Sequence, residues 1–326
     1  MKPSEIHEKV HLDSRVPIDY SLVERAAISS IGDIDGLLSL AGISRDVVAR
    51  VVSDNLRNPL FLSEVERRPE QGVRLYRAIR WSMNERARRI FRVILSRILV
   101  KEGIRLYSAM RGKHRMRKVD YSPPMDFSLE DTLEKLVERS KSLDEISYED
   151  IVGLERRDLR RSAVIIIDSS GSMTGRKMTL ASVLAASVAY AVRFGDYAVI
   201  AFSDRAEILK SAGRRVRVEE VVEKILDLSP IGYTNMREAL VVARRERDLM
   251  GDCRYVLITD GNYNVGGDPL EIAKNMRMLN VVRIERRRDD IGRINCMRIA
   301  EAGRGRVFEL DNISRIPEIL SNIFMN

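Results

Sequence analysis

The sequence predicts an α/β fold, in which a doubly wound, mostly parallel sheet at the C-terminus is preceded by an all-helical N-terminal domain. Two observations support this prediction. From Ser162 onward, short β-branched runs alternate with helical segments, a pattern typical of a parallel sheet covered by helices on both faces. Before about residue 118, apolar residues recur at helical spacing between breaks at Gly, Asn and Pro.

Length and composition indicate a soluble globular protein of one large or two ordinary domains, with 326 residues, 44% of them hydrophobic and 32% charged. The longest apolar stretch, residues 180–192, is shorter than the roughly 20 residues of a membrane helix. The first residues lack a signal-peptide pattern, so we expect no membrane span and a cytoplasmic location. Cys253 and Cys296 are expected to be buried hydrophobic residues. A single glutamine and an excess of Arg over Lys fit a thermophile.

The N-terminal region is strongly basic. Short helices are expected at residues 22–27, 34–40 and 47–56. The segment from Arg74 to Lys118 then holds fifteen Lys or Arg and two Glu, a net charge of +13 in a chain whose net charge is +8. Its apolar residues have helical spacing and predict one long amphipathic helix; they are Ile79, Met83, Ala87, Ile90, Ile94 and Ile98.

The predicted domain organisation has three parts. Residues 1–118 are expected to form a basic helical domain, and residues 119–160, which are rich in Asp and Glu, a short acidic helical connector. Residues 161–326 form the α/β domain. We expect its strands at residues 163–168, 197–202, 206–210, 255–260, 281–285 and 307–310, and its helices at residues 178–194, 218–228, 236–249, 269–279, 293–302 and 316–323.

Oxygen-bearing side chains follow the ends of the predicted strands. Asp168, Ser170 and Ser172 alternate along the turn after the first strand, Thr234 opens a helix, and Asp260 ends the strand at residues 255–260. Because the carboxyl ends of central strands share one crevice in such a sheet, all five side chains are expected to meet there. Hydroxyls and carboxylates without His or Cys favour Mg²⁺ or Mn²⁺ over zinc or copper. A carboxylate from a protein partner could complete the coordination of such an ion.

These residues resemble the metal-ion-dependent adhesion site (MIDAS) of the von Willebrand factor A (VWA) domain. Asp168, Ser170 and Ser172 match its Asp-x-Ser-x-Ser pattern, Thr234 matches its loop threonine, and Thr259-Asp260-Gly261 matches its Thr-Asp-Gly strand end. The resemblance covers residues 161–326 and implies a VWA domain with a complete metal site. The sequence departs from the family at residues 283–290, a charged run where the family more often has an apolar strand that ends in Gly. This run is either a solvated loop or an added contact for an acidic partner.

The arrangement of a helical region ahead of a VWA domain resembles that of the prokaryotic proteins that work with MoxR-type AAA+ ATPases, including the CoxE-like group. The resemblance implies a non-enzymatic adaptor that binds an Asp or Glu of a protein partner through the metal, with a MoxR-type ATPase as the expected associate.

Nucleic-acid binding is the main alternative. The basic segment from Arg74 to Lys118 could neutralise phosphates, and Ro-type RNA-binding proteins also join a helical region to a VWA domain. Their helical part is considerably longer than 118 residues. The same basic face could equally be solvated and pair with the acidic connector.

The sequence contains one motif of metalloenzymes, His7-Glu8-Lys9-Val10-His11, which matches the His-Glu-x-x-His pattern of zinc proteases. Ser14 and Pro17 stand where the longer pattern needs Gly and a third His. We expect no strand ahead of the motif that could hold a substrate. We therefore expect a polar helix or tail here, without catalytic zinc.

Overall fold

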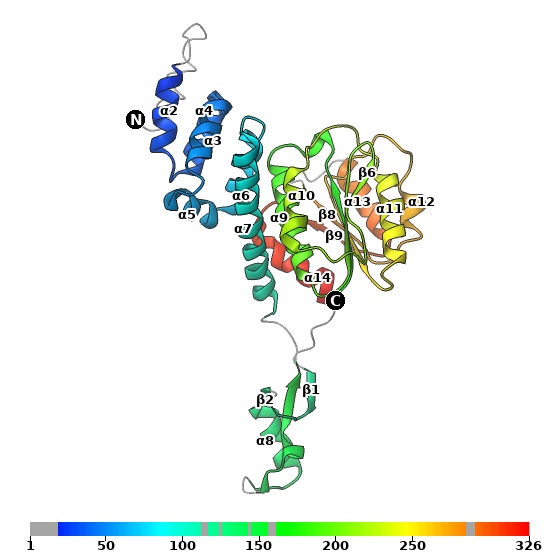
Figure 1. Cartoon of the computed structure of the whole chain (residues 1–326). Helices are drawn as coiled ribbons and strands as arrows, with labels where there is room; N and C mark the ends of the chain where they lie inside the picture. The colour runs from blue at the N-terminus through cyan, green and yellow to red at the C-terminus, as the bar shows by residue number, and fades with distance from the viewer. Residues whose placement is uncertain are drawn as a thin grey trace. The chain divides into compact units, whose positions relative to one another are not determined.

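The computed structural model in Figure 1 describes residues 19–111, 117–123, 126–142, 145–155, 161–284 and 291–325. These residues fall into two units, one made of residues 1–109 with 161–326 and the other of residues 110–160. The predicted motif from His7 to His11 lies outside the described residues, and so do residues 285–290 of the charged run at 283–290.

The sheet of the larger unit has the predicted mostly parallel arrangement. Its strand order is β6-β5-β4-β7-β8-β9, and each neighbouring pair is parallel except β5 and β6, which are antiparallel. The strands are β4 (Ala163–Asp168), β5 (Tyr197–Phe202), β6 (Ala206–Lys210), β7 (Arg254–Thr259), β8 (Leu279–Arg283) and β9 (Val307–Glu309).

Helices cover both faces of this sheet (Figure 1). The residues of β4 and β5 are all buried, as expected for β-branched strands of a parallel sheet with helices on either side. One face carries α9 (Arg176–Ala191), α10 (Val218–Asp227) and α14 (Ile316–Met325), and the other carries α11 (Met236–Asp248), α12 (Leu270–Ala273) and α13 (Ile291–Ala302).

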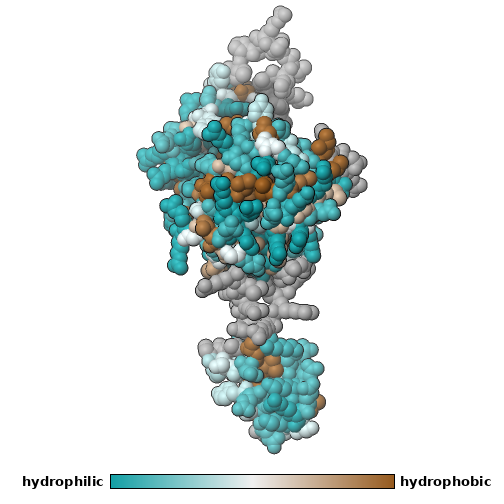
Figure 2. Space-filling view, turned by 90° about the vertical axis from the view of Figure 1, so that its right-hand side faces the viewer, coloured by the Kyte–Doolittle hydropathy of each residue, from teal (hydrophilic) through white to brown (hydrophobic). Residues whose placement is uncertain are grey.

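The outer side of α11 shows how these helices separate core from solvent. Met236, Leu240 and Ala243 pack into the core, whereas Arg244 and Arg245 are exposed. Figure 2 views the molecule from the side of α11 and α12 and shows a mostly hydrophilic surface with a narrow band of apolar side chains.

The predicted helix at residues 269–279 is wrong in length, because α12 ends at Ala273. Met278 has a φ of 57°, which no continuing α-helix accommodates, and β8 begins at the next residue.

The N-terminal region is helical, as predicted. Its helices are α2 (Tyr20–Ser29), α3 (Ile34–Ile43), α4 (Arg45–Asp54), α5 (Pro59–Arg67), α6 (Pro69–Ile79) and α7 (Glu85–Arg111). In the part of the chain that the structure describes, none of the helices combines the length and the apolar character of a membrane span.

The single long basic helix of the prediction is instead two helices, α6 and α7. Asn84 separates them, because its Oδ1 accepts a 2.8 Å hydrogen bond from the backbone N–H of Ala87 and so caps α7. The cap starts a new helix at Glu85, although the helical spacing of apolar residues continues from α6 into α7.

Arg80, at the end of α6, binds the C-terminal end of α10. Its Nη1 donates to the carbonyl oxygen of Leu226 at 2.8 Å, and its Nη2 donates to the carbonyl oxygen of Leu228 at 3.1 Å and to Ser229 Oγ at 2.8 Å. The last carbonyls of a helix lack partners within the helix and attract cations. Arg80 is 3% exposed, so it is part of the packed contact between the helical region and the sheet domain.

Two further arginines of the basic segment reach the same end of α10. Arg77 Nη1 donates to the carbonyl oxygen of Leu228 at 2.9 Å, and Arg92 forms ion pairs with Asp227 and Glu223. Part of the basic segment therefore holds the helical region against the α/β domain, a use that the charge pattern alone did not indicate.

The smaller unit differs from the helical connector that the sequence predicts, because it contains strands as well as a helix. An antiparallel sheet of order β1-β3-β2 accompanies helix α8. Its strands are only three or four residues long, too short for the alternation of apolar and polar residues that predicts strands over four to eight residues. The elements are β1 (Arg117–Asp120), β2 (Asp126–Ser128), α8 (Leu129–Glu138), the 3₁₀ helix η2 (Tyr148–Asp150) and β3 (Val152–Glu155).

Candidate metal centre

The first predicted ligand loop follows β4 directly. Asp168 ends this strand fully buried, and its Oδ1 accepts a 2.9 Å hydrogen bond from the backbone N–H of Ser170. This Asx-type turn leads into a short 3₁₀ helix, η3 (Gly171–Met173). The hydroxyl oxygens of Ser170 and Ser172 lie 3.2 Å apart, the first residue buried and the second exposed. The loop thus presents two adjacent hydroxyls beside a buried carboxylate.

Thr259, the last residue of the neighbouring strand β7, fixes the other oxygen of this carboxylate. Its Oγ1 donates to Asp168 Oδ2 at 2.6 Å and accepts a 3.0 Å hydrogen bond from the backbone N–H of Gly261. Thr259 is fully buried. Both oxygens of Asp168 are therefore oriented before any ion binds.

Asp260 lies one residue further on and is 1% exposed. Its Oδ1 accepts hydrogen bonds from the backbone N–H and the side-chain Nδ2 of Asn262, at 3.1 and 3.2 Å. Its Oδ2 accepts from Lys177 Nζ at 3.0 Å, and Lys177 comes from the first turn of α9. A second oriented carboxylate thus follows the end of β7.

The loop that carries Thr234 is tied to both of the others. Gly232 has a φ of 85°, and its carbonyl oxygen accepts from the backbone N–H of Gly171 at 3.0 Å. The backbone N–H of Thr234 donates to Asn264 Oδ1 at 2.9 Å, and its carbonyl oxygen accepts from the backbone N–H of Asn264 at 3.2 Å. Thr234 itself is 4% exposed. The five predicted residues therefore lie on three mutually hydrogen-bonded loops at the carboxyl ends of β4 and β7.

Burial gives the candidate site an electrostatic signature. It raises the pKa of the Asp168 carboxyl to about 6, although hydrogen bonds from Ser170 and Thr259 oppose this increase, and the nearby charge of Asp260 adds to it. A buried carboxylate that loses hydration is stabilised by a cation held next to it.

The donor set fits a small hard cation. It consists of three hydroxyls and two carboxylates, and these are oxygen donors of the kind that Mg²⁺ and Mn²⁺ prefer. Among the described residues, His, Cys, Asp and Glu side chains form no metal-binding group of three or more. Asp168, Ser170, Ser172, Thr234 and Asp260 are the predicted ligands, and only two of them are carboxylates.

The sequence did not indicate the supporting contacts that Thr259, Lys177, Asn262 and Asn264 make in the candidate site. Thr259 belongs to the matched motif, but its role toward Asp168 depends on the pairing of β4 with β7. Lys177 and Asn264 reach the site from a helix and a loop that carry no recognisable pattern.

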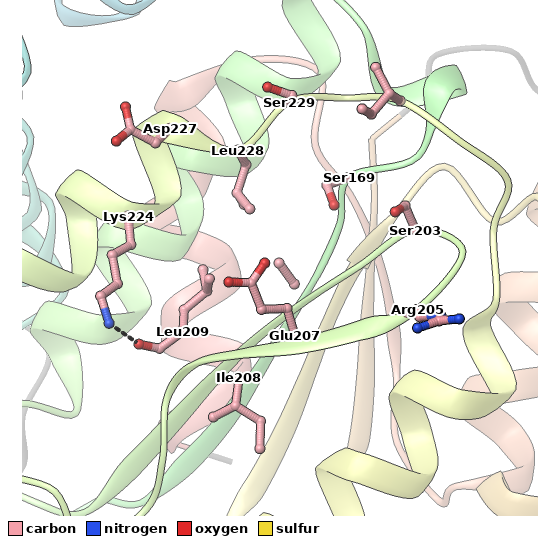
Figure 3. Close-up of a pocket in the computed structure, with 12 residues that line it drawn as sticks. Ser169, Ser203, Arg205, Glu207, Ile208, Leu209, Lys224, Asp227, Leu228 and Ser229 are labelled. Carbon is pink, nitrogen blue, oxygen red and sulfur yellow. Dashed lines mark hydrogen bonds between the residues drawn. The ribbon is translucent and has the colours of Figure 1, made fainter. Parts of the chain in front are cut away.

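A cavity of about 460 Å³ adjoins the first ligand loop without including the five predicted ligands (Figure 3). Ser169 lines it, and its hydroxyl donates to the carbonyl oxygen of Phe202 at 3.0 Å. Lys224 lies on the far side and donates to the carbonyl oxygen of Leu209 at 2.7 Å. Arg205, Glu207 and Asp227 give this cavity a mixed charge.

Comparison with known families gives a match within the α/β domain. Residues 163–262 match the model of the von Willebrand factor type A domain. The C-terminal half therefore has the VWA-type α/β fold, with a mostly parallel sheet, preceded by a helical region. The comparison with curated proteins gave no match.

Several solved structures are similar to about half of this chain. An aerotolerance-related membrane protein from Bacteroides fragilis is 21% identical with a TM-score of 0.42, over 51% of this chain and 100% of that chain. BatB from Bacteroides thetaiotaomicron is 20% identical with a TM-score of 0.41, over 51% and 97%. Proximal thread matrix protein 1 from the mussel byssus, with a zinc-occupied MIDAS motif, is 17% identical with a TM-score of 0.42, over 50% and 45%.

Proposed function

We propose that this protein is a metal-dependent protein-interaction module. The observation that carries the proposal is the pair of hydroxyls on Ser170 and Ser172, 3.2 Å apart, beside the buried and oriented carboxylate of Asp168. Three of the five proposed ligands are neutral hydroxyls, and a divalent cation that they bind still attracts anionic oxygen donors, so a carboxylate from another protein is a favourable additional ligand.

The residues that would hold the ion are those predicted from the sequence, and we propose Mg²⁺, or Mn²⁺, as the cation. When bound, the ion supplies a Lewis-acidic position for an Asp or Glu of the partner. The chain itself orients its ligands, because Thr259 and the N–H of Ser170 hold Asp168, and Asn262 holds Asp260.

Binding rather than catalysis is the proposed activity, and the cytoplasm is the proposed compartment. The setting we propose is a complex with a MoxR-type AAA+ ATPase, supported by the order of a helical region and a VWA-type domain in one chain. A pull-down of such an ATPase by this protein, with and without Mg²⁺, tests this setting. Capture of equal strength without Mg²⁺ and by the variant Asp168→Ala would contradict it.

Isothermal titration calorimetry tests the metal site itself. After treatment with a chelator, the wild type is titrated with Mg²⁺, Mn²⁺ and Zn²⁺. We expect one Mg²⁺ or Mn²⁺ per chain in the wild type and a large loss of affinity in the double variant Ser170→Ala/Ser172→Ala. The variant Ser169→Ala is the matched control, because Ser169 lies in the same loop but faces the neighbouring cavity. Equal binding by the wild type and the double variant would overturn the proposal.

A further inference from the structure

Lys177 places a positive charge inside the candidate metal centre. Its Nζ lies 3.0 Å from Asp260 Oδ2, and the two side chains are 28% and 1% exposed. The lysine is the second residue of α9, the helix that begins just after the loop of Asp168, Ser170 and Ser172. Lys177 therefore contacts Asp260 from α9, the helix that follows the loop carrying the other predicted carboxylate, Asp168.

We propose that Lys177 is an internal counter-ion that competes with the divalent cation for Asp260 and thereby sets the cation affinity of the site. The inference rests on the proposed function, because it concerns the same metal centre. It adds a residue that belongs to no part of the predicted ligand set and assigns to it the regulation of metal occupancy.

The charge of Lys177 acts differently with and without a bound cation. Without a metal ion, the ammonium of Lys177 compensates Asp260, which has lost its hydration through burial. When a divalent cation binds, the same ammonium repels it. Burial makes this repulsion stronger, because water and salt screen it less. The cation must either bind against that charge or displace the ammonium from the carboxylate. Both routes weaken binding relative to a site without the lysine.

The ammonium of Lys177 can move away from Asp260 into solvent. Its side chain is partly exposed, and a long aliphatic stem can carry an ammonium outward into solvent. Asp260 keeps its orientation when the ammonium departs, because the backbone and side chain of Asn262 continue to hold Oδ1. Release of Lys177 therefore frees Oδ2 without dismantling the loop.

The adjacent residue provides a natural contrast. Arg176 also begins α9, but its Nε pairs with Glu70 at 3.3 Å and its Nη2 donates to the carbonyl oxygen of Asp311 at 2.7 Å. Two cations stand side by side in the sequence, and only Lys177 is bonded to a predicted metal ligand. Arg176→Met is thus a matched control for loss of a positive charge at the start of this helix.

Mn²⁺ titration followed by electron paramagnetic resonance of the free ion tests the inference on the full chain. We expect Lys177→Met and Lys177→Gln to bind Mn²⁺ about tenfold more tightly than the wild type, since each removes a charge close to the ion. Lys177→Arg and Arg176→Met should stay near the wild-type affinity. Unchanged binding in both neutral variants would overturn the inference, and weaker binding would instead make Lys177 a residue that positions Asp260.

The variant Asp168→Ala separates this inference from the proposed function. If the wild type and Asp168→Ala bind Mn²⁺ equally, the proposed metal site itself is wrong. If binding depends on Asp168 but not on the charge at position 177, only the role of Lys177 is wrong. Thermal melts in the presence of a chelator establish that each variant is folded, and Lys177→Gln keeps a hydrogen-bond donor in case Lys177→Met fails to fold.

Discussion

The hydroxyl of Thr259 donates a 2.6 Å hydrogen bond to Asp168 Oδ2 and so connects the ends of the two central strands β7 and β4 at one buried carboxylate. The two residues are 91 positions apart in the sequence. Because the N–H of Ser170 holds the other oxygen, the orientation of Asp168 is determined jointly by its own loop and by the neighbouring strand.

The substitution Thr259→Val removes this hydrogen bond with little change in shape. We expect it to lower the free energy of unfolding by about 1.5–3 kcal/mol, the usual range for a buried hydrogen bond to a charged group. Mg²⁺ affinity should fall as well, because Asp168 loses its orientation. Chemical denaturation and calorimetric titration measure the two effects. Thr259→Ser, which keeps the hydroxyl, serves as the control, and a valine variant with wild-type Mg²⁺ affinity would contradict the role given to Thr259.

The raised pKa of Asp168 predicts a pH dependence. In the folded, metal-free protein this pKa moves from 3.8 to about 6, so the folded state favours the protonated carboxyl. The stabilising contribution of Asp168 is complete below pH 3.8 and is lost as the pH rises through about 6. Cation binding requires the ionised carboxylate, so Mg²⁺ should raise the melting temperature more at about pH 7.5 than at about pH 5. Melts of the wild type and Asp168→Asn at both pH values check this, and an equal Mg²⁺ effect at the two values would contradict it.

The strands of the sheet could be predicted because short runs rich in apolar residues alternate with helical segments from Ser162 onward, although the prediction for β8 began two residues too late. The prediction for β4 matches the observed strand, and those for β5 and β6 do as well. The break between α6 and α7 was missed because the apolar spacing continues from Ile79 to Ala87, while a single capping bond of Asn84 ends the regularity. The small sheet of the second unit was missed because its strands pair through backbone groups that leave no periodic apolar signal.

For the candidate site, the sequence indicated the five proposed ligands and Thr259 of the same motif, but not the contacts that support the ligands. Asp168, Ser170 and Ser172 share one short motif, so their proximity follows from local spacing. Thr259 and Lys177 act through contacts between distant segments, and such contacts depend on strand register and helix placement.

Arg80 provides a test of the contact between the helical region and the α/β domain. The variant Arg80→Met leaves the carbonyl oxygens of Leu226 and Leu228 without this donor, and we expect a loss of about 3 kcal/mol in the free energy of unfolding. Urea denaturation measures it. Arg86→Met, which changes an exposed arginine of the same basic segment, should have a much smaller effect. Equal stability of the two variants would contradict the contact.

The same contact bears on nucleic-acid binding. Because Arg77, Arg80 and Arg92 bind the end of α10, they are engaged within the chain instead of facing phosphates. We expect no measurable binding of a single-stranded oligonucleotide at about 50 mM salt. Fluorescence anisotropy over a series of salt concentrations checks this. A steep salt dependence that disappears in Arg86→Ala/Arg89→Ala would establish a nucleic-acid surface and contradict the expectation.

The most direct test of the metal-dependent module is a thermal melt of chelator-treated protein with increasing Mg²⁺, on the wild type and on Asp168→Ala. A ligand that binds only the folded state raises the melting temperature in proportion to the logarithm of its concentration once it exceeds its dissociation constant. We predict this rise for the wild type and its absence for Asp168→Ala. The same rise in both proteins, or in neither, would contradict the assignment of the metal centre.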